Sequence, residues 1–299
     1  MTTMLQVVIG IIFVLLLFSL LATTIMELLA GALGLRGQNL EKALKNMLAN
    51  TDIDEKILEA FKNNSLFKQL SYQFGKKHYA PSYLGSSSFQ SILFDVILDG
   101  KDLNLANIKE QIQSLPDEDL RNVLNQLLQE SEGKIDQFKA NVENWYNNIM
   151  DRASGWYKRY TQRILVLVGF LIAITFNADT IAIYGRLEKD PEALQQIVDM
   201  AYTFAGNNEQ PAIIDRDPDF ELALKNVQEL INQELASVKT PLGLGWTNVK
   251  LSEISPTDWL IKILGWTVTA LSVSLGAPFW FDLLRSFVNL RSSGNKPKS

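Results

Sequence analysis

The sequence predicts an all-α integral membrane protein with three transmembrane helices. Three apolar runs of very low charge, at residues 5–26, 164–184 and 263–281, carry this prediction. The last run lies in a charge-free gap between Lys262 and Asp282, which at about 1.5 Å per residue spans a hydrocarbon core of about 30 Å. Between the runs, apolar residues recur at helical spacing. We therefore expect six segments: 1–35 (first transmembrane helix and its exit), 36–162 (cytoplasmic helical domain), 163–186 (second transmembrane helix), 187–257 (acidic, smaller extracytoplasmic helical loop domain), 258–284 (third transmembrane helix) and 285–299 (basic cytoplasmic tail).

The composition excludes several classes of site. The chain has 299 residues, a formal net charge of -5, no cysteine and one histidine. Without cysteine there are no disulfides, thiolate metal sites, iron–sulfur clusters or cysteine nucleophiles, and a single histidine leaves no multi-histidine metal site. An acidic balance without a basic cluster argues against nucleic acid as a partner. We expect no catalytic residue, no cofactor and no metal.

The first apolar run predicts a retained transmembrane helix, not a signal peptide. No Lys or Arg precedes it, and no A-x-A cleavage pattern follows before Arg36. Ser19, Thr23, Thr24 and Glu27 fall near helical spacing, so we expect them to share one face. These hydroxyls either bond back to their own helix or meet a neighbouring helix.

The segment 36–162 has the pattern of a helical domain. Residues 36–50 predict an amphipathic helix, and residues 52–132 predict several short ones. Residues 133–162 predict one long helix that continues into the second apolar run without a helix-breaking residue. Trp156, with two nearby tyrosines and basic residues, predicts an interfacial belt.

Polar residues interrupt the second and third apolar runs. Asn177 and Asp179 lie inside the second, and an ionisable group within a span is a candidate functional residue. The alternative is an interfacial or packed Asp179. In the third run, Pro278 predicts a kink that frees the carbonyl near Ser274. The loop between them, 187–257, has helical patterns at 191–205 and 218–238.

The distribution of Lys and Arg predicts the orientation. Near the ends of the runs, eleven lie on one side and four on the other. Because basic residues are retained in the cytoplasm, we expect the N-terminus outside and the C-terminus cytoplasmic. The eleven are Arg36, Lys42, Lys45, Arg152, Lys158, Arg159, Arg163, Arg285, Arg291, Lys296 and Lys298; the four are Arg186, Lys189, Lys239 and Lys250.

This orientation places several charges together at the cytoplasmic boundary. Glu27, Asp282 and Arg285 fall at similar depth to Arg163, which is the natural partner of either carboxylate. The arrangement is either an ion or proton site or a ring of pairs that sets depth and packing.

Three segments together resemble a known family. They are SLLATTIMELLAGALGLRGQNLEKALKNML, PSYLGSSSFQSILFDVI and GWTVTALSVSLGAPFWFDLLRSFVNLR, of which RGQNLEKAL and GAPFWFDLL are distinctive. They resemble a widespread family of uncharacterised bacterial multi-pass membrane proteins. The resemblance implies three spans and a bacterial inner (cytoplasmic) membrane, and it implies no activity.

Three functional hypotheses remain. The first is a membrane-anchored scaffold or assembly subunit, which presents the helical cytoplasmic domain to a protein partner or to copies of itself. The second is an oligomeric transport or pore component that uses the polar face of the first run and Asp179. The third, an enzyme, rests on His78 alone. It is the weakest hypothesis, because a lone histidine in a loop is usually only solvated. The expected partners are therefore membrane lipids and either another protein or further copies of the chain.

Overall fold

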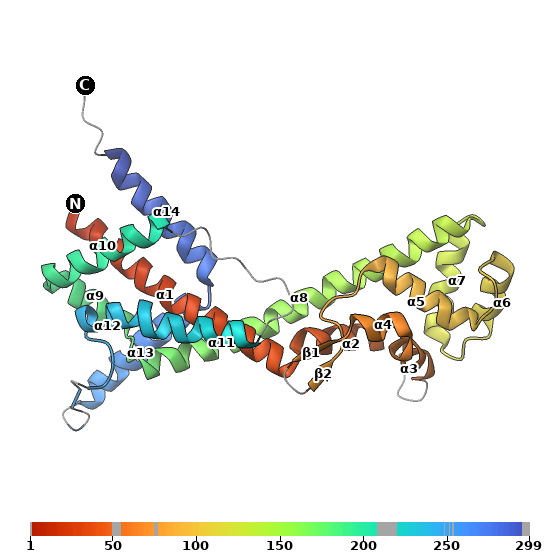
Figure 1. Ribbon diagram of the computed structural model, residues 1–299, viewed down its shortest axis with the longest axis horizontal. Helices are drawn as coiled ribbons and strands as arrows, with labels where there is room; N and C mark the ends of the chain where they lie inside the picture. The colour runs from red at the N-terminus through yellow and green to blue at the C-terminus, as the bar shows by residue number, and fades with distance from the viewer. Residues whose placement is uncertain are drawn as a thin grey trace. The chain divides into compact units, whose positions relative to one another are not determined.

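The computed structural model describes residues 2–49, 55–74, 77–207, 220–247, 249–250, 252 and 254–294. The described part is almost entirely helical, as the sequence predicts, with one small pair of strands (Figure 1). It divides into two compact units: unit 1 comprises residues 1–29 and 160–299, and unit 2 comprises Ala30–Arg159. Two helices, α1 (Thr2–Leu33) and α8 (Ile135–Thr175), contribute to both units.

Unit 2 is built from short amphipathic helices around its own apolar core. They are α2 (Leu35–Leu48), α3 (Lys56–Asn63), α4 (Ser65–Leu70), α5 (Ser86–Leu98), α6 (Leu105–Gln113) and α7 (Glu118–Glu130). The predicted apolar face of α2 is confirmed, because Leu40, Leu44 and Met47 are buried. The first part of α8 completes this core with Phe138, Val142 and Tyr146.

Unit 2 also contains a β-hairpin that the helical periodicity does not predict. Strands β1 (Tyr72–Phe74) and β2 (Lys77–Tyr79) pair antiparallel. The Tyr79 hydroxyl donates to the Ala32 carbonyl at 2.6 Å, and the Tyr79 ring occupies the space where a β-carbon on Gly34 would lie. Gly34 has φ 60° between α1 and α2, a conformation that glycine adopts without steric cost.

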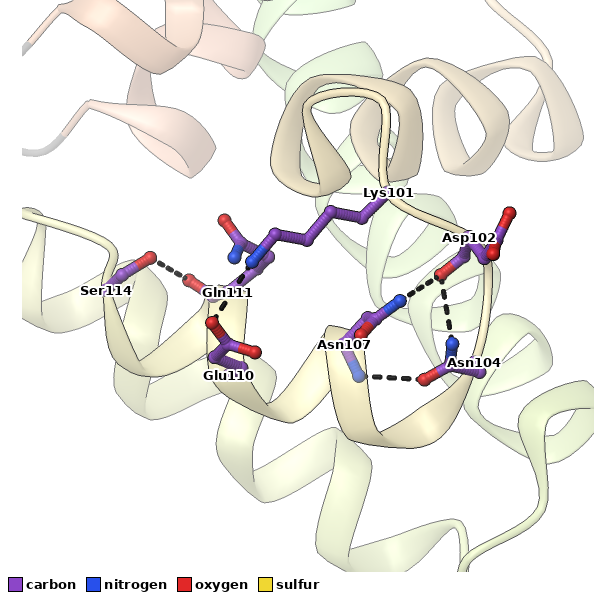
Figure 2. A network of polar contacts seen from close by, with 7 residues as sticks. All are labelled: Lys101, Asp102, Asn104, Asn107, Glu110, Gln111 and Ser114. Atoms are coloured by element: carbon purple, nitrogen blue, oxygen red, sulfur yellow. Dashed lines mark hydrogen bonds and ion pairs between the residues drawn. The ribbon is translucent and has the colours of Figure 1, made fainter.

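A local network of side chains fixes the start of α6 (Figure 2). Asn104 caps the helix, since its Oδ1 accepts the backbone N–H of Asn107 at 2.9 Å. The Asp102 carbonyl accepts Nδ2 of Asn107 at 2.9 Å. Lys101 pairs with Glu110 one turn further on at 3.0 Å. These contacts satisfy backbone groups that a helix start would otherwise leave without partners.

In unit 1, α1 lies in the interior of the packed helices. Eight consecutive residues, Ile12 to Ser19, are buried, which covers every face of a helix with about 3.6 residues per turn. Helix α1 is long and apolar enough to cross a membrane; if each bent helix pair counts as one span, the described residues hold up to three. An all-round apolar helix fits both a protein core and a membrane span.

The second and third apolar runs are broken helices, whereas the sequence predicts a single helix for each. Helix α8 ends at Thr175, and α9 (Thr180–Lys189) follows at a bend of 49°. Helix α13 (Pro256–Val273) is followed by α14 (Ala277–Gly294) at a bend of 91°. The segments 163–186 and 258–284 therefore each contain a break between two helices.

The helices of 187–257 do not form a compact unit of their own. They are α10 (Pro191–Asn207), α11 (Phe220–Glu229), a π-helix (Leu230–Leu235) and α12 (Ala236–Leu242). Their apolar residues join the same core as α1: the Phe13 and Phe204 rings are 5.6 Å apart. The acidic composition predicts a separate loop domain, but the apolar face of α10 packs on α1.

Candidate functional site

The break between α8 and α9 holds two of the candidate residues, Asn177 and Asp179. Asn177 has φ 49°, a left-handed conformation that Asn tolerates better than most residues. Asp179 begins α9, because its Oδ1 accepts the backbone N–H groups of Ile181 at 2.9 Å and Ala182 at 3.2 Å. A capping side chain at this point ends the preceding helix and starts the next.

Two backbone carbonyls at this break accept hydrogen bonds from a distant loop. Nε1 of Trp246 donates to the Ile174 carbonyl at 2.8 Å, and the Gly245 N–H donates to the Phe176 carbonyl at 2.8 Å. In return, Nδ2 of Asn177 donates to the Gly245 carbonyl at 3.0 Å. The break is thus held by residues about seventy positions away and has few free backbone groups.

Helix α13 closes the other side of Asp179. The carboxylate is 4% exposed, and it fills the position that a β-carbon on Gly265 would need. The Thr269 hydroxyl lies 2.7 Å from the Ala178 carbonyl and 2.7 Å from the Thr180 hydroxyl. Asp179 is therefore a buried cap of α9.

Two buried polar atoms near this break lack a hydrogen-bond partner among the described residues: Oδ1 of Asn177 and Nε1 of Trp266. Trp266 lies edge-on to Trp246 and to Trp259, with ring centres 5.8 and 6.2 Å apart. The Lys262 ammonium lies 5.6 Å from the centre of the Trp266 ring. A cation over an indole face is favourable.

An open cleft of about 510 Å³ lies beside Asp179. Its lining includes two carboxylate residues, Asp179 and Asp258, and two lysines, Lys250 and Lys262. Asp258 belongs to the capping box of α13, since its side chain accepts from Ser255. The charges of both carboxylates are thus shared with backbone and side-chain donors of helix starts.

The second break, between α13 and α14, has the same construction. Pro278 has no N–H to donate to Ser274, and Nε2 of Gln162 supplies the donor to that carbonyl at 2.7 Å. The two preceding carbonyls, Ser272 and Val273, accept Nε1 of Trp280 at 2.7 Å and the Ser19 hydroxyl at 3.2 Å. The prediction of a freed carbonyl near Ser274 is confirmed, but the helix stops at Val273 instead of kinking at Pro278.

The remaining candidate residues lie apart from the α8–α9 break. Glu27 is half-buried on α1 and has a polar partner, and Arg163 is exposed on α8. Asp282 and Arg285 are exposed on α14, each with a partner, and the Arg285 guanidinium lies 4.8 Å from the Phe281 ring centre. The ion pair of Arg163 with Glu27 or Asp282 stays a prediction. The side chain of His78 and the basic residues Lys296 and Lys298 lie outside the described part.

Sequence reasoning missed most of the partners at the two breaks. The sequence places Trp246 near the membrane interface but does not identify it, or Gly245, Gly265, Thr269 and Gln162, as a partner of a break. Ser19 was placed on a polar face of the first run and does bond to another helix. The only signal in the sequence was the presence of a small or polar residue inside an apolar run. Such a residue does not show which distant residue it will contact. No group of three His, Asp or Glu that could hold a metal occurs among the described residues.

Comparisons with known proteins return no relative. No family model matches the chain, and no curated protein and no solved structure matches it either.

Proposed function

We propose that the chain is a membrane-anchored scaffold or assembly subunit that presents unit 2 to a protein partner. The observation that carries this proposal is the division of the chain: unit 2 has its own apolar core, whereas unit 1 contains the membrane-capable helix α1 and the two bent pairs. Helix α8 contributes to both units. An independent core lets unit 2 keep its fold outside a lipid environment.

The proposed setting is the inner membrane of a bacterium, as part of the multi-pass family that the chain resembles. The N-terminus lies outside, and unit 2 and the tail lie in the cytoplasm, in line with eleven basic residues against four. The third crossing has the weakest support, because α14 turns by 91° from α13 and packs on α10. If the third segment were re-entrant, it would return to the side of the membrane from which it entered, and α10 and the C-terminal tail would lie on the same side.

Labelling of single cysteines tests this topology, since the chain has none of its own. We expect Leu103→Cys, on unit 2, to resist a membrane-impermeant maleimide in intact cells and to react after permeabilisation. Gln233→Cys, exposed in the 187–257 segment, should react in intact cells. Labelling of both or of neither in intact cells contradicts the proposed orientation, and loss of the chain from carbonate-washed membranes contradicts the anchoring.

The surface on unit 2 best suited to a partner is a groove between α6 and α7. It has a volume of about 600 Å³, and amide side chains dominate its lining, among them Gln113, Asn125, Gln126 and Gln129. Amides donate and accept hydrogen bonds without a charge, which suits the backbone of a polar protein segment.

Photo-cross-linking in cells tests the scaffold function. A benzophenone amino acid at Gln126 or Gln129 should give the same discrete adduct, while the matched exposed position Asp136 on α8 should give none. Adducts of equal yield from all three positions, or none from the groove, would contradict a partner at this surface.

The alternative function is an oligomeric transport or pore component. Two broken helices within apolar segments favour it, because transporters use such breaks to bind ions at exposed backbone groups. Against it, the carbonyls at both breaks already accept protein donors. The alternative predicts an ion flux in vesicles that Asp179→Asn or Glu27→Gln reduces; unchanged flux, or no flux from the parent chain, removes it.

A further inference from the structure

The outer side of α13 is a mainly apolar surface. Leu260, Leu264 and Leu271 are each more than half exposed, and their spacing of four and seven residues places them on one face of α13. Leu275, in the turn just after α13, is also more than half exposed. Val268, between them, is also exposed. No charged residue lies between Lys262 and Asp282. A surface of this kind on a water-soluble protein would expose a large apolar patch.

The neighbouring helix α8 has the same kind of outer side. Leu167 and Leu171 are 59% and 55% exposed and lie one turn apart. We name these seven residues the outer apolar face: Leu167, Leu171, Leu260, Leu264, Val268, Leu271 and Leu275.

The exposed hydroxyls beside this face are already satisfied within their own helices. Thr267 donates to the Ile263 carbonyl at 2.7 Å, and Thr175 donates to the Leu171 carbonyl at 2.8 Å. Hydrocarbon offers no hydrogen bonds, so a surface in contact with it must satisfy its polar groups internally. The outer apolar face meets this requirement.

Aromatic residues lie at both ends of α13. Trp259, in the first turn of α13, packs with Trp266 in the middle of the helix, which also packs with Trp246. Lys262 lies over the Trp246 and Trp266 rings, and Phe279 and Trp280 lie beyond the end of α13. Aromatic belts mark the two edges of a bilayer.

Among the described residues of unit 1, neither α1 nor α10 has an exposed apolar face of this kind. Residues Ile12 to Ser19 of α1 are enclosed by protein, so the most apolar segment has no outer surface there. The exposed residues of α10 are polar, among them Glu192, Gln196, Asp199 and Thr203, which suits water.

A second copy of the chain is a poorer occupant of this face than lipid. Helices pack together in membranes through small residues that allow close approach. Here the small residues point inward: a β-carbon on Gly169 would lie 3.1 Å from the Ala270 carbonyl. The side chains that point outward are bulky and aliphatic, which suits fluid acyl chains.

We propose that the outer apolar face is the lipid-contact surface of the chain, and that the enclosed part of α1, residues 12–19, has no contact with lipid. This inference rests on the membrane anchoring in the proposed function. It reverses the expectation from hydropathy alone, by which the most apolar segment would meet the most lipid.

Spin labelling of single-cysteine variants in vesicles tests the proposal. Labels at Leu264→Cys, Leu271→Cys and Leu167→Cys should be more accessible to oxygen, which concentrates in hydrocarbon, than to a water-soluble nickel chelate. Labels at the matched controls Gln196→Cys and Thr203→Cys should show the opposite order. Higher nickel accessibility at the three leucine positions overturns the proposal, and so does low accessibility to both reagents, which indicates cover by a second copy.

A second measurement covers α1 without altering it. A phospholipid with a photoreactive acyl chain, incorporated into vesicles with the unmodified chain, should attach to α13 and α8 and leave residues 12–19 unlabelled. Adducts on residues 12–19 overturn the proposal. Retention of the chain in carbonate-washed membranes separates the two claims: a chain that washes off refutes the anchoring, whereas a retained chain with the wrong labelled face refutes only this inference.

Discussion

Asp179 occupies the space beside Gly265 that a β-carbon at position 265 would need. The carboxylate caps α9, and the glycine lies on α13, so one contact fixes a helix start against a neighbouring helix. The two residues are 86 positions apart in the sequence. The buried Asp179 carboxylate needs space beside α13, and Gly265 leaves that space because it has no side chain.

Gly265→Ala should destabilise unit 1, because the new methyl group overlaps the Asp179 carboxylate. Overpacking of a filled site costs about 1–3 kcal/mol. The matched control is Gly185→Ala on α9, where no atom lies within 4 Å of the new β-carbon and replacing a helical glycine should stabilise by about 0.5–1 kcal/mol. Thermal unfolding of both variants in detergent measures the difference; equal melting temperatures would contradict the contact.

Substitution of Asp179 should separate its capping role from its charge. Asp179→Asn should unfold at nearly the parent temperature, because Asn caps helices as well as Asp does, whereas Asp179→Ala should lose about 0.5–2 kcal/mol. The measurement is again thermal unfolding. A large loss in Asp179→Asn would mean that the negative charge itself holds the break, contrary to the packed-cap reading.

Gln162→Ala should weaken the α13–α14 break. It removes the side-chain donor to the Ser274 carbonyl, and a buried acceptor left without a partner costs about 1–3 kcal/mol. Gln196→Ala on the polar side of α10 is the control and should change the free energy of unfolding by less than about 0.5 kcal/mol. Limited proteolysis near residues 274–276 should increase in Gln162→Ala alone; an unchanged pattern would argue against this bond.

Because Tyr146 is buried, the free energy of unfolding should fall at alkaline pH. Burial, and secondarily the nearby Tyr83, raises the pKa of Tyr146 well above its usual value, and the neutral hydroxyl donates to the Leu84 carbonyl at 2.6 Å. Above the unfolded pKa of about 10, the unfolded chain releases this proton first, so stability falls as pH rises.

Tyr146→Phe should therefore flatten the decline above pH about 10, while costing about 1 kcal/mol at neutral pH from the lost hydrogen bond. Urea unfolding between pH 7 and 11 measures both effects. Tyr160→Phe, at an exposed site, is the control and should leave the decline unchanged. A parent chain with constant stability to pH 11 would refute the buried, neutral phenol.

Several local features of this protein can be predicted from its sequence. Apolar spacing placed α2 and the long α8, and the polar interruptions at Asn177 and Asp179 marked the place where the second apolar run breaks. Pro278 marked the region of the other break. These signals lie within a few residues of the structure they specify, because helix propensity, capping and missing N–H groups act locally.

The contacts around these features depend on how distant parts of the chain pack together. One donor to the Val273 carbonyl is Ser19, 254 residues away, and one donor to the Ile174 carbonyl is Trp246, 72 residues away. The enclosure of α1 and the hairpin that closes on Gly34 also depend on distant packing. An apolar residue gains free energy equally from lipid and from a protein interior, so hydropathy alone cannot distinguish an enclosed helix from one in contact with a bilayer.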